Sequence, residues 1–258
     1  MILRRFAQAL NEQNWTAITI EFVLLVLGVF LGIQVANWNQ ALADRRVADK
    51  YLAEIAGDIR SDLSELASTR ASALDRIGAS SYIIRQAGAS ALVPDLELNP
   101  TTNAALAGFD HMTIPDVAAP TVERRNRLWS LTTDTYMYDA NRSAYDALVS
   151  SGKIDLINDE RVKVVLREYY YLVNALSATQ VRTLAPLRDQ IIATGLARGH
   201  SHMGIADERA LVEQVGKDPA FAASVATSRE LAATHLLICL ALEKKAHEAL
   251  RLLEAGRS

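Results

Sequence analysis

The sequence predicts an all-α protein in which one N-terminal transmembrane helix continues into an extramembrane bundle of four or five helices. Three observations predict this class. A run of about 21 apolar residues lies near the N-terminus, apolar residues recur every three or four positions in most of the remaining chain, and no segment of any length alternates as a β-strand does. With 50% hydrophobic and 22% charged residues, the 258-residue chain is too apolar for a disordered protein.

The segment 16–36, TAITIEFVLLVLGVFLGIQVA, has the length of a helix that crosses the hydrocarbon layer of a bilayer, about 30 Å. Glu21 is its one ionisable residue. Trp15 and Trp38 bracket the segment, and indole rings prefer the two headgroup interfaces. We therefore expect a short tail at 1–15, a transmembrane helix at 16–38, and an extracytoplasmic helical domain at 39–258.

The predicted span is expected to stay attached to the domain. A cleavable signal peptide is the alternative, because Ala41-Leu42-Ala43 before Asp44 has the small residues of a cleavage site. The apolar run exceeds the roughly 7–15 residues of a signal peptide, which favours an uncleaved anchor. Basic residues flank both ends almost equally. The short basic tail and long C-terminal domain, rather than the charge balance, predict a cytoplasmic N-terminus and a translocated domain.

One face of the predicted span carries small and polar residues. Gly28 and Gly32 form a GxxxG motif, which allows close approach of two helix backbones, and an intramembrane acid such as Glu21 normally faces protein. An advance of 100° per residue places both features on one side of the helix. The alternative is that the glycines are merely common in membrane helices and that Glu21 reaches interfacial water. The predicted helix-contact face consists of Glu21, Leu25, Gly28, Gly32, Ala36 and Asn39.

After the span, apolar positions spaced three or four apart predict a long amphipathic helix that ends near Ala87-Gly88. An irregular loop is expected at about 89–120, where four prolines interrupt the pattern, with one short helix at 103–109. A short helix is then predicted at 143–150, closed by Gly152.

The C-terminal half is predicted to consist of further helices. A long one starts at Asn158, whose side chain can cap it, and Pro186 is expected to kink it. A turn at 195–204, a shorter helix at 207–215, and a last long helix from 224 to about 255 follow.

Signatures of catalysis are missing from the sequence. It contains no GxSxG, Walker A, GxGxxG or HExxH motif. His200 and His202 lack an acidic or thiol partner at metal-ligand spacing and are interpreted as residues of a solvated loop, and Cys239 lies in an apolar setting that raises a thiol pKa. We therefore expect no enzymatic activity, no metal and no cofactor. A net charge of −3 gives no attraction for nucleic acid.

Two groups of side chains remain as candidate binding residues. Arg124, Arg125 and Arg127 form the one compact basic cluster and could contact an anion or an acidic partner, with a solvated turn as the alternative. The tyrosines are expected to pack at helix interfaces, with a binding groove as the alternative. They concentrate at Tyr136, Tyr138, Tyr145, Tyr169, Tyr170 and Tyr171.

Two stretches resemble a known bacterial family. The first is Glu21 with the following apolar run and Gly32-Ile33-Gln34-Val35-Ala36-Asn37-Trp38-Asn39. The second is Tyr145-Asp146-Ala147-Leu148, Ser150-Ser151-Gly152-Lys153-Ile154 and Leu166-Arg167-Glu168-Tyr169-Tyr170. Together they resemble the domain of unknown function 6090, covering residues 15–45 well and 140–175 moderately. The resemblance implies a single-span protein with a helical region after the span, and no catalytic residues.

These observations lead to a non-enzymatic, single-pass protein of the bacterial inner membrane with a periplasmic domain. We expect the lipid bilayer and a protein as its partners. The protein would act in assembly, either as a homo-oligomer through the transmembrane helix or as an accessory subunit of a larger membrane complex. The alternative is an extracytoplasmic sensory or ligand-binding bundle that signals through a partner, because about 15 residues before the span leave no room for an output domain of its own.

Overall fold

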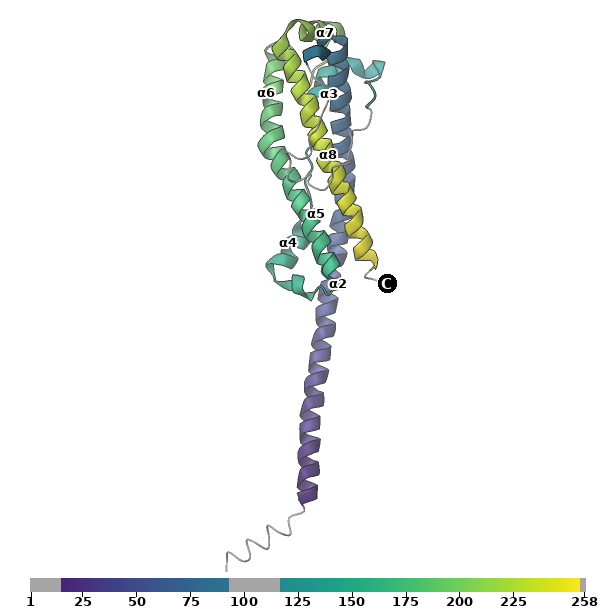
Figure 1. The fold of residues 1–258 in the computed structure, drawn as a ribbon, viewed down its shortest axis with the longest axis vertical. Helices are drawn as coiled ribbons and strands as arrows, with labels where there is room; N and C mark the ends of the chain where they lie inside the picture. Colours follow the sequence, from purple (N-terminus) through teal and green to yellow (C-terminus); the bar gives the residue numbers. More distant parts are fainter. Residues whose placement is uncertain (1–14, 93–116, 256–258) are drawn as a thin grey trace, which may run out of the picture. The chain divides into compact units, whose positions relative to one another are not determined.

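The computed structural model describes residues 15–92 and 117–255, which are mostly helical and contain no strand (Figure 1). The all-α class is therefore confirmed for these residues, while the number of helices in the bundle stays a prediction. The chain divides into two compact units, Met1–Lys50 and Tyr51–Ser258. Each unit is described separately below.

Helix α2 (Trp15–Gln86) contributes residues to both units. No proline interrupts it, and it ends before Gly88, whose positive φ of 64° stops the helix close to the predicted position. In the second unit its predicted apolar stripe is buried, with Ile55, Ile59 and Leu66 fully inaccessible. The long amphipathic helix is thus confirmed.

Helix α5 (Glu160–Thr179) passes through a π-helical turn, η6 (Gln180–Leu184), into α6 (Ala185–Leu196). The π-turn lies just before Pro186, which has no N–H to donate to the preceding turn. A local disturbance at this proline was expected from the sequence. The first cap differs by one residue, because the side chain of Asp159, not Asn158, accepts from the backbone N–H of Arg161.

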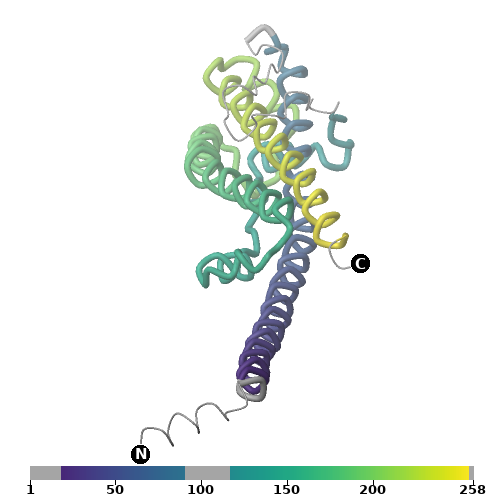
Figure 2. The backbone as a smooth tube through the Cα atoms, turned by 60° about the horizontal axis from the view of Figure 1, so that its bottom comes forward, coloured from purple at the N-terminus to yellow at the C-terminus, as the bar shows by residue number. Residues whose placement is uncertain are grey.

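Helix α8 (Pro219–Ala255) supplies the largest share of the core of the second unit and lies against α5 and α6 (Figure 2). It begins five residues earlier than predicted. Asp218 precedes Pro219 at the first helical position and accepts from the backbone N–H groups of Ala220 and Phe221, and these two features form a helix start that outweighs the weak apolar pattern there.

Short helical elements complete the second unit. Helix α4 (Ser143–Ser150) and the turn at Gly152, whose φ is 68°, match the prediction, as does α7 (Glu208–Lys217), capped by Asp207. The 3₁₀ turns η1 (Ala89–Leu92), η4 (Val122–Arg127) and η5 (Lys153–Leu156) and helix α3 (Leu128–Thr133) join the longer helices. The helix predicted at 103–109 lies outside the described residues, as does most of the loop predicted at 89–120.

Gly195 corrects one predicted boundary. It was expected to open a turn, but it lies within the last turn of α6, because the fully buried ring of Trp129 occupies the space of a side chain there. A Cβ at Gly195 would lie 2.1 Å from Cζ2 of Trp129. The glycine therefore serves close packing between α3 and α6 rather than helix termination.

Candidate functional site

The first candidate site is the apolar part of α2 in the Met1–Lys50 unit. Its described side chains from 19 to 41 are all exposed, and the large apolar ones from Ile20 to Trp38 are 47% to 66% accessible. A Cβ added at Gly28 or Gly32 would meet nothing within 4 Å, so these glycines do not serve packing within the described chain. A monomeric soluble protein rarely exposes apolar surface of this extent.

Each residue of the predicted helix-contact face belongs to α2. Glu21, Leu25, Gly28, Gly32, Ala36 and Asn39 are exposed side chains of one helix. Trp38 is 65% exposed, as expected of a ring that needs an external interface, while the side chain of Trp15 lies outside the described part. The structure leaves this face uncovered, and its contacts stay a prediction.

Two described helices are long and apolar enough to cross a membrane, judged by length and composition alone. In α2 the most apolar window has a mean hydropathy of 2.2 and none of it is buried. In α8 the corresponding value is 1.3, and two thirds of the window is buried. A core helix of a soluble domain meets the same criterion, and α8 packs against α5 in the main hydrophobic cluster. The two helices therefore differ in what covers their apolar side chains.

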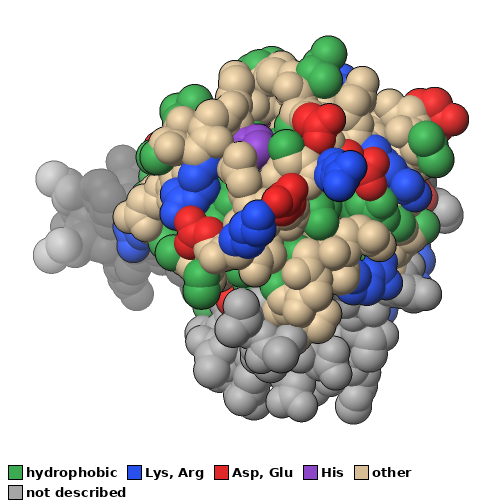
Figure 3. Space-filling model, turned by 90° about the horizontal axis from the view of Figure 1, so that it is seen from above, with side chains coloured by type: hydrophobic (Ala, Val, Ile, Leu, Met, Phe, Trp, Pro, Cys, Tyr) green, Lys and Arg blue, Asp and Glu red, His purple; other side chains and the backbone are tan. Residues whose placement is uncertain are grey.

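Two arginines of the predicted basic cluster have partners within the chain. Arg124 donates to both carboxylate oxygens of Asp75, at 2.9 and 2.6 Å, and Arg125 lies over the ring of Tyr82, 4.7 Å from its centroid. Arg127 is exposed. Acidic and basic side chains are interspersed over the end of the second unit that carries α7 (Figure 3). An acidic partner at Arg124 and Arg125 would have to compete with these internal contacts.

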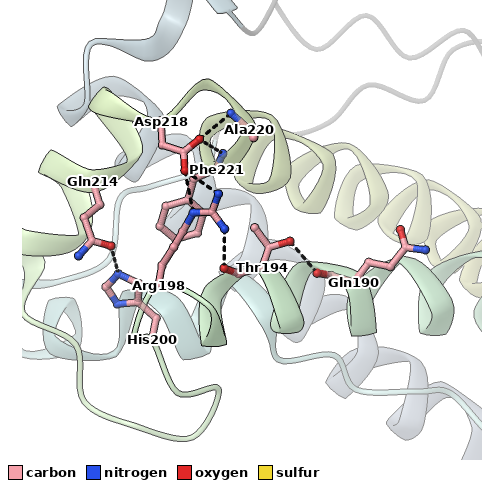
Figure 4. Close-up of polar contacts among 8 residues, drawn as sticks. All are labelled: Gln190, Thr194, Arg198, His200, Gln214, Asp218, Ala220 and Phe221. Atoms are coloured by element: carbon pink, nitrogen blue, oxygen red, sulfur yellow. Dashed lines mark hydrogen bonds and ion pairs between the residues drawn. The ribbon is translucent and has the colours of Figure 1, made fainter.

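The interpretation of a solvated loop is wrong for His200, which is buried, whereas His202 is partly exposed. His200 is 7% exposed, its Nε2 lies 2.9 Å from Oε1 of Gln214, and its ring stacks on Phe221 (Figure 4). His202 Nδ1 lies 2.7 Å from the hydroxyl of Thr133. Sequence spacing missed both residues, because their partners come from α7, α8 and α3, which are distant along the chain.

An ion pair joins the C-terminal end of α6 to the start of α8 (Figure 4). Arg198 donates from Nε and Nη2 to one carboxylate oxygen of Asp218, at 2.8 and 2.5 Å, and from Nη1 to the carbonyl of Thr194. The other carboxylate oxygen accepts from the first backbone N–H groups of α8. This one carboxylate therefore neutralises a cation and caps a helix.

We expect Asp218→Asn to lower the Tm at pH 7 and to lose this effect in acid. The hydrogen bonds from Arg198 hold the pKa of Asp218 below its usual value. A depressed carboxylate pKa contributes stability above the pKa of the unfolded chain, about 4, and this contribution disappears as the pH falls through the folded value. Thermal unfolding from pH 7 to pH 2.5 measures it. Asp139→Asn, at an exposed position, is the control. The difference between its Tm and that of the wild type should not shrink in acid in the same way.

A second candidate site is a polar network inside the bundle. Asp62 of α2 is 2% exposed, and its carboxylate accepts from the hydroxyl of Tyr169 at 2.6 Å and from the backbone N–H of Asn141 at 3.0 Å. The hydroxyl of Tyr138 lies 3.4 Å from that of Tyr169. Burial raises the pKa of Asp62, while these hydrogen bonds oppose the rise. Burial also raises the pKa of Tyr138 and Tyr169.

The network continues to α8 through Gln180 of the π-turn. Its amide exchanges two hydrogen bonds with the backbone of Tyr138, at 2.9 and 2.8 Å, and its Oε1 lies 3.0 Å from Nε2 of His235. Burial lowers the pKa of His235 to about 3, so the ring is neutral, and its Nδ1 has no partner in the described chain. The network joins α2, η6 and α8 through directional bonds, which fix the register of these helices.

The tyrosines divide between core and surface. Tyr169 and Tyr170 are buried as expected, and Tyr145 stacks on Tyr170 with ring centroids 3.8 Å apart. Tyr171 is 56% exposed. Cys239 is buried, and burial raises the pKa of its thiol to about 12, in the predicted direction.

A cavity of about 250 Å³ opens beside α2. Its walls carry two carboxylates, those of Asp75 and Asp134, together with four hydroxyl groups and one apolar side chain. Asp75 is paired with Arg124, while the exposed carboxylate of Asp134 has no ion-pair partner among the described residues. The arrangement suits a small polar ligand with a positive group. The full lining is Ser68, Ser72, Asp75, Leu131, Asp134, Thr135 and Tyr136.

Comparison of the chain with protein-family models, with curated proteins and with solved structures finds no match. Function is therefore inferred from the geometry of the chain itself.

Proposed function

We propose that the protein is a single-pass membrane protein whose apolar α2 segment spans the bilayer once and whose helical domain acts in assembly, as a homo-oligomer or an accessory subunit of a membrane complex. One observation carries this proposal: the apolar side chains from Ile20 to Trp38 are about half exposed or more and have no cover within the described chain. Burying such a surface in lipid or against another helix is strongly favourable.

The proposal assigns no span to α8. Its apolar side chains already pack inside the Tyr51–Ser258 unit, and moving them into lipid would unfold the polar network at His235 and the clusters around it. The bacterial inner membrane, a cytoplasmic N-terminus, a periplasmic domain and membership of the family with domain of unknown function 6090 belong to the same proposal. Their support is the sequence pattern described above.

The helix-contact face supplies the test of assembly. The variant Gly28→Leu/Gly32→Leu should reduce the fraction of protein cross-linked in native membranes, on the order of tenfold, because large side chains separate backbones that glycines allow to touch. The matched control, Val23→Leu/Phe30→Leu, changes the opposite side of the same segment and should leave cross-linking unchanged. Equal cross-linking of both variants, or an uncross-linked wild type, would contradict the assembly role.

A ligand-binding role is the second candidate, favoured by the 250 Å³ cavity with the unpaired carboxylate of Asp134. A thermal-shift screen of small amines and amino polyols on the detergent-solubilised protein tests it. A ligand of this site should raise the Tm of the wild type and of Asp139→Asn but not that of Asp134→Asn. If no such compound raises the Tm, this second role fails and the assembly role is unaffected.

A further inference from the structure

Arg76 of α2 is a buried guanidinium without a carboxylate partner among the described residues. Its side chain is 3% exposed, and no carboxylate of the described residues lies within ion-pair distance. Nη1 donates to the hydroxyl of Thr135 at 2.9 Å, Nη2 donates to the carbonyl of Ser228 at 3.5 Å, and Nε has no hydrogen-bond partner within residues 15–92 and 117–255. Buried charges in proteins are normally paired, and the part of the chain that the structure describes supplies no close counter-charge for this cation.

A second arginine faces the same space. Arg188 of α6 and Arg76 both line a small cavity whose other walls come from α3, α6, α8 and Thr135, two residues after the end of α3. Arg188 donates from Nε to the carbonyl of Thr133 at 3.1 Å, and its Nη1 lies 3.9 Å from the largely exposed carboxylate of Asp189. The full lining is Arg76, Thr133, Thr135, Arg188, Ile191, Ser228 and Leu231.

The surrounding titratable groups do not compensate the two cations. His202 lies 3.3 Å from Nη2 of Arg188, and burial and this arginine lower its pKa, which keeps the ring neutral. His235 is neutral as well. Burial, and after it the charge of Arg188, lower the pKa of Arg76 to about 10. The exposed carboxylate of Asp134 opposes this decrease only in part. These groups leave the charge of Arg76 largely unbalanced, and Arg188 brings a second guanidinium to the wall of the same cavity.

The size of the cavity selects the ligand class. Its volume is about 10 Å³, close to the minimum that holds one water molecule. A phosphate or a carboxylate-bearing metabolite is much larger than this, and a monatomic halide is the class of anion that needs the least further opening of the cavity. We propose that the cavity between Arg76 and Arg188 is a binding site for a single chloride ion, which supplies the missing counter-charge and holds α2, α6 and α8 together. The proposal is independent of membrane insertion.

Thermal unfolding of the full-length protein in detergent tests the site. Sodium chloride replaces sodium gluconate at constant ionic strength and pH 7. The wild-type Tm should rise with the logarithm of the chloride concentration above the Kd, by about 5 °C once the concentration exceeds the Kd a hundredfold. The ³⁵Cl resonance should broaden in the presence of the protein. Bromide should act like chloride.

Two variants identify the site. Arg76→Met has a similar length and no charge, so its Tm in gluconate should equal or exceed that of the wild type, and it should be independent of chloride. Arg188→Met, at a partly exposed position, should also lose the chloride response and serves if the first variant fails to fold. Arg85→Met, an exposed position of the same helix, is the matched control and should keep the response.

Three results would overturn the proposal. The first is a wild-type Tm that is equal in chloride and in gluconate with no ³⁵Cl broadening, which is the result expected for a cavity that holds water alone. The second is a chloride response that survives in both arginine variants. The third is stabilisation by phosphate or sulfate but not by halides. None of these results bears on whether α2 spans a membrane, so the two proposals fail separately.

Discussion

The variant Leu24→Arg/Leu27→Arg is expected to shift the protein from the membrane to the soluble or aggregated fraction. Both leucines lie near the middle of the exposed apolar segment of α2 and are 61% and 48% exposed. An arginine near the centre of a transmembrane helix costs about 2.5–3.5 kcal/mol of insertion free energy, so two of them cost about 5–7 kcal/mol. Alkaline carbonate extraction of membranes, followed by immunoblotting of pellet and supernatant, measures the shift.

The matched control places the same two charges elsewhere on α2. Ser61→Arg/Ser64→Arg has the same spacing, and both serines are exposed in the second unit. This variant should remain in the membrane pellet with the wild type. Retention of the Leu24→Arg/Leu27→Arg variant at the wild-type level would show that the apolar segment of α2 does not hold the protein in the membrane.

Asp62→Ala is expected to destabilise the bundle strongly, because it removes a buried hydrogen-bond acceptor. It leaves the backbone N–H of Asn141 and the hydroxyl of Tyr169 without their buried acceptor, and each such loss costs about 1–3 kcal/mol. We expect a decrease of about 2–4 kcal/mol in the free energy of unfolding. Urea denaturation followed by circular dichroism measures it, and Asp139→Ala at an exposed position should change it little.

The contribution of Asp62 to folding stability changes with pH in the opposite direction to that of Asp218. Burial raises the pKa of Asp62, so the folded state keeps a proton to higher pH than the unfolded chain does. The contribution of Asp62 to stability therefore falls as the pH rises from about 4 through the raised pKa. Asp62→Asn removes this dependence, and its unfolding free energy relative to wild type should improve with pH over that range. A constant difference would mean that the carboxyl does not titrate in the folded state.

Sequence periodicity predicted the helices well because the apolar spacing, glycines and prolines that determine a helix lie within the helix or next to it. The apolar stripe of α2, the glycine after α4 and the proline in the first turn of α6 each influence only the backbone within a few residues. The boundary at the end of α6 failed because a distant residue decides it. Gly195 resembles a helix stop, yet the ring of Trp129 requires a glycine at that position inside the helix.

The polar sites were not predictable from spacing. Asp62, Tyr169 and His235 belong to three helices, and each alone has the pattern of an ordinary polar residue on an amphipathic helix. Arg76 was likewise one of many arginines between apolar positions. Only the packing of α2 against α8 shows that this guanidinium is buried without a carboxylate. The exposed apolar segment of α2, in contrast, was predictable from the sequence, because its composition alone indicated that it needs lipid or another protein around it.

Protease digestion of urea-washed membranes, with both faces open, tests the central claim of one span in α2 most directly. Peptides embedded in lipid stay with the membrane and are identified by mass spectrometry. A single span in α2 predicts a retained peptide that covers 19–38 and the release of all peptides from α8. Retention of a peptide from 219–255, or release of the α2 segment, would contradict it.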